Sequence, residues 1–556
     1  MTEKQIEILE RQGCWCDDWS RVSISSDADL RKIRNVFFRG DVAIGSNPEI
    51  INVPGGIADV RIGDNVRIVN VARICRSSGA SYGVGCDVAV LDETGTRPVR
   101  IYPGISAQVA ALAAFDPEFA ASKLFPMIDR LTASLPDSPE IGDGASITDC
   151  GPICDVRIWP GVSVEGAARL KNGSIVSNCA PGASPLAFVG HGVDAEDFII
   201  EDSVVKGGCL LRHVYVGQGC VLDKRFTAHD SLFFANCAME NGEACALLAG
   251  PYTVSMHKSS LLIGVQTSFM NAGSGTNMSN HTYKLGPVHW GVMERGAKTA
   301  SNAYVMHGSC IGAYSLVMGD HKTHPDTSPF PFSYLFGDAR GVTSVVPGAM
   351  LKSYGLRRDG EKWPRRDHRR GRGIPLIDRI TFPVLNPLTV DRMLGALDLI
   401  SNLLAGSSDD EIMAGGLKVS RRHLKQGAEL YKMAIALYLH RLGATASTTA
   451  EDSPKNGAHD KMGGGKWIDL GSQLMPQKAL TQLKATGSIA EIEKILDRMA
   501  ADYEALQREW IATKPELSRP EIDIEAYAAH LESLIEADRQ AAIRSLRQEG
   551  RQDSPS

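Results

Sequence analysis

The feature that most constrains the fold of this chain is an apolar residue at every sixth position over a long stretch. The residues of this series are Phe198, Val204, Leu210, Val216, Leu222, Ala228 and Phe234. Neither an α-helix, with a period of about 3.6 residues, nor an alternating strand has this repeat. It is typical of a left-handed parallel β-helix, where each hexapeptide forms one short strand and one corner of a triangular coil. The alternative is a generic all-β domain with chance spacing, although a sandwich has no reason to keep a period of six.

The same repeat recurs in three other parts of the chain. Its members are Ile62, Ile68 and Ile74, then Ile158, Val164, Leu170 and Val176, and finally Val305, Ile311 and Val317. In the last group, small residues stand two positions before the apolar ones, where a coil has little room: Ala303, Ser309 and Ser315. We therefore predict a mainly β fold in which a left-handed β-helix is followed by an α-helical domain.

Four parts are expected along the chain. They are an N-terminal β block with a helical insertion (1–135), the main left-handed β-helix (136–350), a basic connector (351–385) and an α-helical domain (386–556). Within the first block, 81–102 reads as a hairpin with turn residues at 93–95, and 106–134 as helices with a break at Pro117. In the last part, apolar residues recur at spacings of three and four, and Thr389 is a possible N-cap of the first helix.

Composition narrows the functional classes. A net charge of −6 over 556 residues provides no global basic field for nucleic acid. The first residues, MTEKQIEILERQ, lack the apolar core of a secretory signal, and no run of about 18 apolar residues predicts a membrane span. The 12 cysteines are scattered: Cys14 with Cys16, or Cys150 with Cys154, could bind metal, but buried small apolar residues are the simpler interpretation. We expect a cytoplasmic protein.

An arginine-rich segment follows the β-helix. Seven arginines lie between 357 and 372, among them Arg365 and Arg366. One interpretation is a solvated connector. The other is a clamp for the phosphate of a ligand, because guanidinium groups match phosphate oxygens. RNA is a weaker third option, because few aromatic residues interrupt the arginines.

Histidines are concentrated in the β-helix, where nine of the 14 lie between 191 and 324. Asn271, His289 and His307 recur at the interval of one coil of three hexapeptides. If they stack, the two imidazoles could bind Zn²⁺ or act as acid and base. The alternative is a hydrogen-bonded ladder of corner side chains.

One stretch carries a family resemblance. His257, followed by Asn271-Ala-Gly273-Ser274-Gly275-Thr276 and by Asn280, resembles the acetyltransferase half of the bifunctional N-acetylglucosamine-1-phosphate uridylyltransferases. The resemblance implies that His257 is a general base, that Asn271 and Asn280 hold the ligand, and that Gly273, Ser274 and Gly275 bring backbone to it. The prediction of substrate-binding residues also includes Asn277, His281, Lys284, Arg365 and Arg366. The chain as a whole resembles a bacterial family of long hexapeptide-repeat proteins with a helical C-terminal domain.

These observations lead to one favoured function and two alternatives. We predict a transferase that acts on a sugar phosphate or nucleotide sugar, with acyl-CoA as a candidate donor and His257, His289 and His307 as catalytic residues. The resemblance implies a homotrimer with the site in a cleft between subunits, and the helical domain could raise the assembly to a hexamer. The first alternative is an enzyme that uses zinc or magnesium, as the γ-class carbonic anhydrases use zinc, with His289, His307, His321 and His324 as ligands. The second is a non-enzymatic scaffold.

Overall fold

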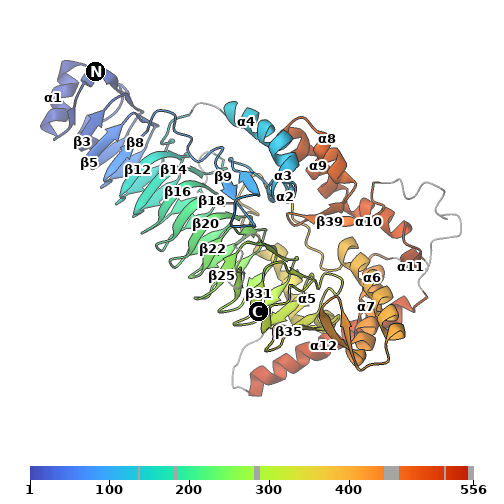
Figure 1. Ribbon diagram of the computed structural model, residues 1–556. Coiled ribbons are helices and arrows are strands. Elements are labelled where there is room, and N and C mark those ends of the chain that lie inside the picture. The colour runs from blue at the N-terminus through green and yellow to red at the C-terminus, as the bar shows by residue number, and fades with distance from the viewer. Residues whose placement is uncertain (136–137, 181–184, 281–288, 444–461, 519–520, 549–556) are drawn as a thin grey trace. The chain divides into compact units, whose positions relative to one another are not determined.

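The computed structural model describes residues 1–135, 138–180, 185–280, 289–443, 462–518 and 521–548. The chain forms a parallel β-solenoid with helices in its C-terminal region, as the sequence predicts at this level of detail (Figure 1). It divides into two compact units: unit 1 comprises 1–265 and 367–378, and unit 2 comprises 266–366 and 379–556. The division falls inside the predicted main β-helix, and part of the predicted connector belongs to unit 1. In the described ranges, no helix combines the length and the apolar character that crossing a membrane requires.

Unit 1 consists mainly of short strands in successive coils. Its helices are α1 (Glu3–Arg11), α2 (Ala107–Phe115), α3 (Pro117–Phe119) and α4 (Phe125–Ala133). Its strands are β1 (Trp15–Cys16), β2 (Val22–Ile24), β3 (Ile33–Arg39), β4 (Val42–Ile44), β5 (Glu49–Ala58), β6 (Arg61–Ile62), β7 (Arg67–Val69), β8 (Arg73–Cys75), β9 (Asp87–Ala89), β10 (Pro98–Arg100), β11 (Ser146–Thr148), β12 (Pro152–Ile158), β13 (Ser163–Glu165), β14 (Arg169–Val176), β15 (Phe188–Val189), β16 (Asp194–Glu201), β17 (Val204–Val205), β18 (Leu210–Val216), β19 (Val221–Asp223), β20 (Thr227–Phe233), β21 (Ala238–Glu240), β22 (Glu243–Cys245), β23 (Leu248–Ala249), β24 (Val254–Ser255) and β25 (Leu261–Ile263).

Each coil of unit 1 pairs in parallel with the next, so that equivalent residues stack. Ile50 pairs with Ile68, which gives a coil of 18 residues. Val205 pairs with Leu222 in a slightly shorter coil, and all four of these side chains are fully buried. The core is therefore a column of apolar layers, and the main chain satisfies its hydrogen bonds between coils.

Coil length explains where the six-residue repeat fails. Ala195 pairs with Leu211 in a coil that is shorter still, and the shortening shifts the phase of the inward positions. Leu210, a predicted core residue, is 47% exposed, and Leu211 occupies the core in its place. The other six members of that series are buried or, in the case of Val204, half-buried. All members of the three other groups are buried, as predicted.

A long insertion separates β8 from β12, whose residues Ile74 and Ile153 nevertheless pair directly. It contains the predicted hairpin, formed by β9 and β10, and the predicted helices α2 to α4, with Pro117 beginning α3. A disulfide joins Cys75 to Cys154 on the paired strands at the base of this insertion. Cys154 is thus not a metal ligand beside Cys150, as one interpretation of the sequence had it, and its sulfur is not a free thiol.

Unit 2 contains the remaining coils and most helices of the chain. Its strands are β26 (Val265–Thr267, which begins at the unit boundary), β27 (Asn271–Ala272), β28 (Asn277–Ser279), β29 (Gly291–Met293), β30 (Lys298–Thr299), β31 (Tyr304–Met306), β32 (Cys310–Ile311), β33 (Leu316–Met318), β34 (Asp320–His321), β35 (Tyr334–Gly337), β36 (Thr343–Val346), β37 (Glu411–Ala414), β38 (Leu417–Ser420), β39 (Trp467–Leu470) and β40 (Gln473–Pro476). Its helices are α5 (Tyr354–Lys362), α6 (Pro387–Gly406), α7 (Arg421–Arg441), α8 (Ala479–Ala485), α9 (Ile489–Ala501), α10 (Tyr503–Ala512), α11 (Pro515–Ser518) and α12 (Ile524–Gln548).

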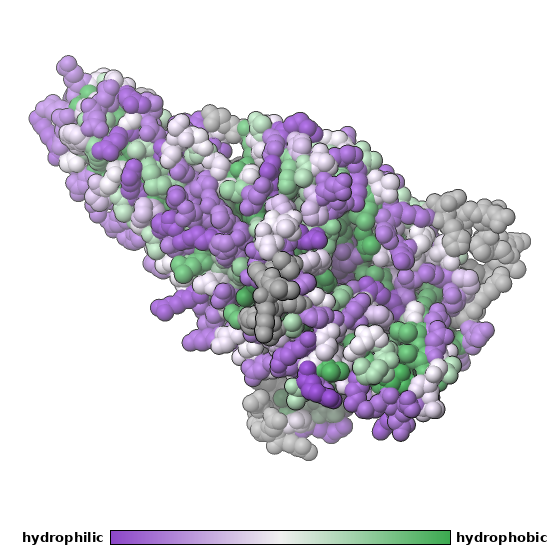
Figure 2. Space-filling model, in the orientation of Figure 1, coloured by the Kyte–Doolittle hydropathy of each residue, from purple (hydrophilic) through white to green (hydrophobic). Residues whose placement is uncertain are grey.

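The parallel stacking in unit 2 ends where β36 pairs antiparallel with β35. The helices follow, and a patch of apolar residues lies over α6 and α7 on the face shown in Figure 2. The predicted N-cap of α6 was wrong by three residues. Asn386 caps the helix, with its Oδ1 accepting a hydrogen bond from the amide of Thr389 at 3.1 Å, and Pro387 occupies the first helical position.

The burial of β18 leads to a matched pair of predictions. Val216 is fully buried in the solenoid, so Val216→Asp places an unpaired carboxylate in the core. We expect a loss of about 3–5 kcal/mol in the free energy of unfolding, or insoluble protein. Leu210→Asp, in the same strand but 47% exposed, should change stability by about 0.5 kcal/mol. Urea denaturation followed by circular dichroism measures both, and equal midpoints would contradict the register described here.

Candidate functional site

A column of polar residues runs along one edge of the solenoid in unit 1. It contains Asn172, Asp197, His213 and Asp230, from β14, β16, β18 and β20. All four have left-handed backbone conformations, with φ between 46° and 54°, and each marks a bend within its strand. Asn, Asp and His tolerate this conformation better than other residues with a side chain, which explains why the corners are polar. Their neighbours pair in register from coil to coil, so the four residues stack directly.

The column brings two histidines and two aspartates together. Nε2 of His213 lies 3.3 Å from Oδ2 of Asp197, and its Nδ1 lies 3.5 Å from Oδ1 of Asp230. Nδ1 of His229, one residue before the corner, lies 2.7 Å from Oδ2 of Asp230. The two imidazole rings meet edge to face, with centroids 5.5 Å apart. Asp197 and Asp230 are about one-quarter exposed or less, whereas the imidazoles are half-exposed.

This cluster has the composition of a metal centre. One ligand atom from each of His213, His229 and Asp230 lies within 4.8 Å of the other two, and no other group of three His, Cys, Asp or Glu residues in the described parts of the chain meets this distance. Ligand atoms around a tetrahedral zinc lie about 3.3 Å apart, given metal–ligand distances of about 2.0–2.2 Å. Closing the triad to these distances requires the two half-exposed imidazoles to rotate.

The surroundings of His213 contain the kind of carboxylate that orients a metal-binding histidine. Metal-binding histidines usually give their second ring nitrogen to a carboxylate, which fixes the orientation of the ring. Asp197 has this position relative to His213, and Nδ2 of Asn172 donates to Oδ1 of Asp197 at 2.5 Å. A plain ladder, the alternative raised from the sequence, exists elsewhere in unit 1: Asn52 donates to Asn70 at 3.0 Å, and Asn70 donates to Asp149 at 2.9 Å. That ladder contains no imidazole.

The hairpin of the long insertion contacts this edge. The amide of Ala89 in β9 donates to Oδ1 of Asp230 at 3.4 Å. On the other side, His229 pairs in register with Cys245 of β22. Burial raises the pKa of the Cys245 thiol to about 11, so it is a neutral thiol at physiological pH. One face of the cluster thus remains open to solvent, since both histidine side chains are exposed.

The predicted stack of Asn271, His289 and His307 is not formed. Asn271 pairs with Lys298, and Asn277 of β28 pairs with Tyr304 of β31 at the same interval. These coils are longer than the expected three hexapeptides, which puts Asn271 out of line with His289. Of the pair that remains, His289 is exposed and His307 is buried.

The other residues of the predicted transferase site fall in two units. His257 lies in an exposed loop of unit 1, and Asn271, Gly273, Ser274, Gly275, Asn277 and Asn280 lie in unit 2. A Cβ at Gly273 would lie 2.6 Å from the carbonyl carbon of Ala300, so the backbone that approaches it closely is that of the next coil. The buried Asn280 donates to the carbonyl of His289 at 2.7 Å. His281 and Lys284 lie outside the described residues.

The four histidines of the metal alternative do not form a cluster. His321 is fully buried, with Nδ1 at 2.8 Å from the Thr343 hydroxyl and Nε2 at 3.2 Å from the Met318 carbonyl. Burial lowers its pKa, and neither ring nitrogen points toward an open site. Nδ1 of His324 lies 2.7 Å from the carbonyl of His307. These four described histidines form no group of three whose ligand atoms lie within 4.8 Å of one another, so the structure does not bring them together as a metal site.

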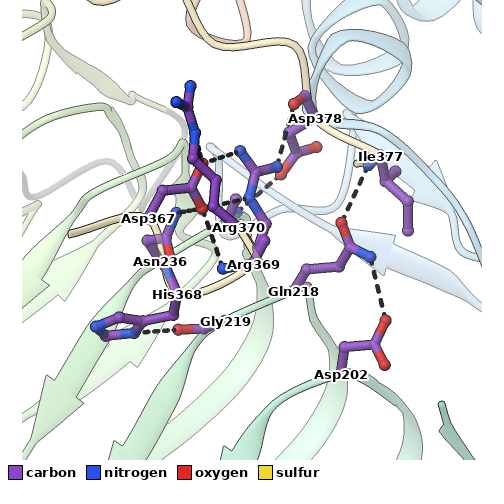
Figure 3. A network of polar contacts seen from close by, with 12 residues as sticks. Asp202, Gln218, Gly219, Asn236, Asp367, His368, Arg369, Arg370, Ile377 and Asp378 are labelled. Carbon is purple, nitrogen blue, oxygen red and sulfur yellow. Dashed lines mark hydrogen bonds and ion pairs between the residues drawn. The ribbon is translucent and has the colours of Figure 1, made fainter. Parts of the chain in front are cut away.

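The arginine-rich segment has two different parts. Arg365 and Arg366 are the last two residues of the segment that belong to unit 2, and both are exposed. Exposure is what a solvated connector and a phosphate clamp both require. Residues 367–378, which we call the strap, are instead bound to the solenoid of unit 1 by buried polar contacts (Figure 3). Arg369 and Asp367 form a bidentate pair with N–O distances of 2.8 and 2.9 Å, and both side chains are about 2% exposed or less. Arg369 is thus a structural residue and not an anion clamp.

Polar side chains of the coils hold the strap along its length. Asn236 donates to Asp367 at 3.0 Å and accepts from the amide of His368 at 2.9 Å. Gln218 donates to the carbonyl of Pro375 at 2.9 Å. It also accepts from the amide of Ile377 at 3.0 Å (Figure 3).

At the end of the strap, one carboxylate joins the strap to two other elements. Asp378 accepts hydrogen bonds from the amides of Ala107 at 2.7 Å and Ala235 at 2.8 Å. The strap thereby fixes the first turn of α2 to a coil of unit 1.

A buried carboxylate with a perturbed pKa lies in the same unit. Burial raises the pKa of Glu201 to about 7, although three donors favour its charged form. Those donors are the Tyr215 hydroxyl at 2.9 Å, Asn178 at 2.8 Å and the amide of Gly104 at 2.8 Å. Such groups are candidates for general acids or bases. Glu201 is only 1% exposed, however, so its contacts hold the insertion in place and no substrate reaches it.

Sequence reasoning noticed the density of histidines but missed the pair that meets. His229 follows His213 at less than three hexapeptides, and Asp230 comes directly after it. Only a search at this shorter interval would have aligned the pair with Asp197. The search for residues spaced by three hexapeptides could not find Asp197, His213 and His229.

Comparisons with known proteins identify relatives without a described activity. A family model described as "Domain of unknown function (DUF4954)" matches residues 1–60 and 50–404, a span that contains both the histidine–aspartate column and the strap. A relative from Treponema pallidum (strain Nichols), described as "Uncharacterized protein", is 24% identical over 602 residues, which cover 91% of this chain and 80% of the relative.

The strap generates a prediction about stability. Asp367→Ala leaves the Arg369 guanidinium buried without its carboxylate. We therefore expect the free energy of unfolding to fall by about 3–5 kcal/mol. Arg370→Ala is the matched control, because Arg370 also approaches Asp367, at 3.5 Å, but its side chain is 58% exposed. Arg370→Ala should lower the free energy of unfolding by only about 0–1 kcal/mol.

The pH dependence has a definite sign. Burial alone raises the pKa of Asp367, but Arg369 and Asn236 lower it to about 2, below its value in the unfolded chain. The stability that the Asp367 carboxylate contributes is therefore complete above about pH 4 and is lost as the pH falls toward 2. Denaturation curves at pH 7 and pH 3 measure this, and an Asp367→Ala variant as stable as wild type at pH 7 would show that the strap is dispensable.

Proposed function

The chain belongs to the DUF4954 family, and we propose from its geometry that it is a metal-dependent enzyme whose zinc-type centre lies at the histidine–aspartate edge of unit 1. One observation carries the proposal: His213, His229 and Asp230 present ligand atoms within 4.8 Å of one another. Three protein ligands on an open surface leave at least one coordination position for water or substrate, which is the arrangement of catalytic zinc sites.

The residues of the cluster have distinct roles in this proposal. His213 and His229 supply neutral imidazole nitrogens, and Asp230 supplies a carboxylate oxygen. Asp197 holds His213 through its second nitrogen, and Asn172 holds Asp197. A bound divalent ion lowers the pKa of its water and polarises a carbonyl or phosphoryl oxygen, which favours hydrolysis or hydration of a small polar substrate. Zinc is preferred over magnesium, because imidazole is a poor ligand for magnesium.

Several finer predictions from the sequence join this proposal. Left-handed winding remains a proposal, and coil lengths of 16 to 18 residues, close to three hexapeptides, favour it. The homotrimer and the cytoplasmic location remain proposals that rest on the resemblance and on composition. Transfer to a sugar phosphate from a donor such as acyl-CoA stays a prediction, and the exposure of His257 is compatible with it.

Metal binding can be measured directly on the purified full-length protein without an affinity tag. We expect about one equivalent of zinc per chain by mass spectrometry of the metal, after dialysis against zinc and removal of excess ion. Cobalt substitution should give visible absorption bands of a four- or five-coordinate site. His213→Ala and His229→Ala should each lose the ion, and the zinc-dependent rise in melting temperature should disappear with it.

His191→Ala is the matched control for these variants. His191 is also an exposed histidine on the solenoid of unit 1, with Nε2 at 3.4 Å from Glu165, but it belongs to no group of three described ligand residues. The His191→Ala variant should bind zinc with the same affinity as the wild type. Loss of zinc in all three variants alike, or no zinc in the wild type, would contradict the proposal.

A separate substitution decides the transferase prediction. If His257 is a general base, His257→Ala should lower acyl transfer to a sugar phosphate by about a hundredfold or more. Stability should change little, because the residue is exposed. The assay measures release of free CoA with a panel of amino-sugar phosphates. Wild-type turnover that His257→Ala leaves intact would remove His257 from the site, whatever the zinc measurements give.

A further inference from the structure

Unit 2 contains a cavity of about 610 Å³. It is lined by the segment 379–385, by the C-terminal end of α7, and by residues of α9 and α10. This volume lies within the range of about 300–1,000 Å³ that is usual for small-molecule sites. The cavity has no residue in common with the histidine–aspartate column, which belongs to unit 1.

The cavity is lined by a buried glutamine and by two tyrosines whose hydroxyls have no hydrogen-bond partner in the described structure. Gln507 lines the cavity and is 5% exposed. The hydroxyls of Tyr438 and Tyr503 are also buried and without a partner there. Buried polar groups are nearly always satisfied, so two such hydroxyls around one cavity point to a ligand that carries hydrogen-bonding atoms. Burial raises the pKa of both tyrosines, so their hydroxyls are donors at neutral pH.

The same cavity has a cationic side. Arg441 and Arg508 line it. Nη2 of Arg441 lies 3.1 Å from Oε1 of Glu532, a carboxylate that it shares with Arg357. Arg508 is exposed and, within the described residues, pairs with no carboxylate. Guanidinium groups with spare donors bind phosphate oxygens well.

A third part of the lining is apolar and partly aromatic. Phe382, Val384 and Leu385 form one wall of the cavity. A sugar phosphate by itself would leave this wall without a partner, whereas a flat ring can cover it. The cavity therefore combines an apolar wall, unpaired hydrogen-bonding groups and guanidinium groups.

From this combination we infer that the cavity binds a nucleoside phosphate. The base covers Phe382 and its apolar neighbours, Gln507 and the two tyrosine hydroxyls bind polar atoms of the base or the ribose, and Arg508 and Arg441 bind the phosphate. The inference does not depend on the metal site, because all of these residues lie in unit 2.

The test uses the full-length protein and isothermal titration with AMP, UMP, CMP and GMP and the corresponding diphosphates. At least one nucleotide should bind, and both ribose 5-phosphate and the unphosphorylated nucleoside should bind at least tenfold more weakly. Tyr503→Phe and Tyr438→Phe should weaken binding by about two- to tenfold each without lowering the melting temperature, because the lost hydroxyl has no protein partner among the described residues. Arg508→Gln should weaken binding and reduce its dependence on salt.

The matched control is Tyr431→Phe in the same helix as Tyr438, α7. The Tyr431 hydroxyl donates to the carbonyl of Pro331 at 2.8 Å, and the residue does not line the cavity. This variant should melt at a lower temperature and bind the nucleotide with unchanged affinity. No binding of any nucleotide, binding of ribose 5-phosphate as tight as that of the nucleotide, or Tyr→Phe variants at 438 and 503 that bind like wild type would each overturn the inference.

Discussion

The parallel stacking of coils in register is the constraint on which the rest of the structure depends. Adjacent coils lie about 4.8 Å apart, because that is the spacing of hydrogen-bonded strands. A residue at a corner therefore faces its equivalents in the coils before and after, and a polar corner residue needs a partner there. Asn52, Asn70 and Asp149 meet this need with amide hydrogen bonds. Where the corner is His213 between Asp197 and Asp230, the same spacing brings imidazole and carboxylate to within reach of one metal ion.

The sequence predicts those features of this structure that depend on neighbouring residues, and it does not predict those that depend on how distant coils align. The six-residue repeat identified the solenoid, because burial of one residue per short strand is a local property. Register was not predictable in the same way. A shortened coil moved Leu210 to the surface, and a lengthened one set Asn271 beside Lys298. Each change of coil length shifts every alignment that follows, so Asn271 is out of line with His289, and the pair of His213 and His229 was not singled out.

The strap shows why composition alone misleads about charged segments. Seven arginines between 357 and 372 suggested a surface that binds anions or remains solvated. Arg369 is instead buried in a bidentate pair with Asp367, and the strap's other partners, Asn236 and Gln218, come from a distant part of the chain. A buried ion pair adds little net stability over an apolar replacement. Its value here lies in position, since a strap joined to particular polar side chains can adopt only one alignment on the coils.

If both proposed sites are occupied, their binding free energies are subject to linkage, although the sites lie in separate units. An ion bound in unit 1 and a nucleotide bound in unit 2 each stabilise the folded chain by mass action. If the ion changes the affinity for the nucleotide, the nucleotide must change the affinity for the ion by the same factor. Titrating each ligand with and without the other measures that factor. A factor of one would mean that the units act independently, whereas any other value requires that the free energy of one site depends on the state of the other.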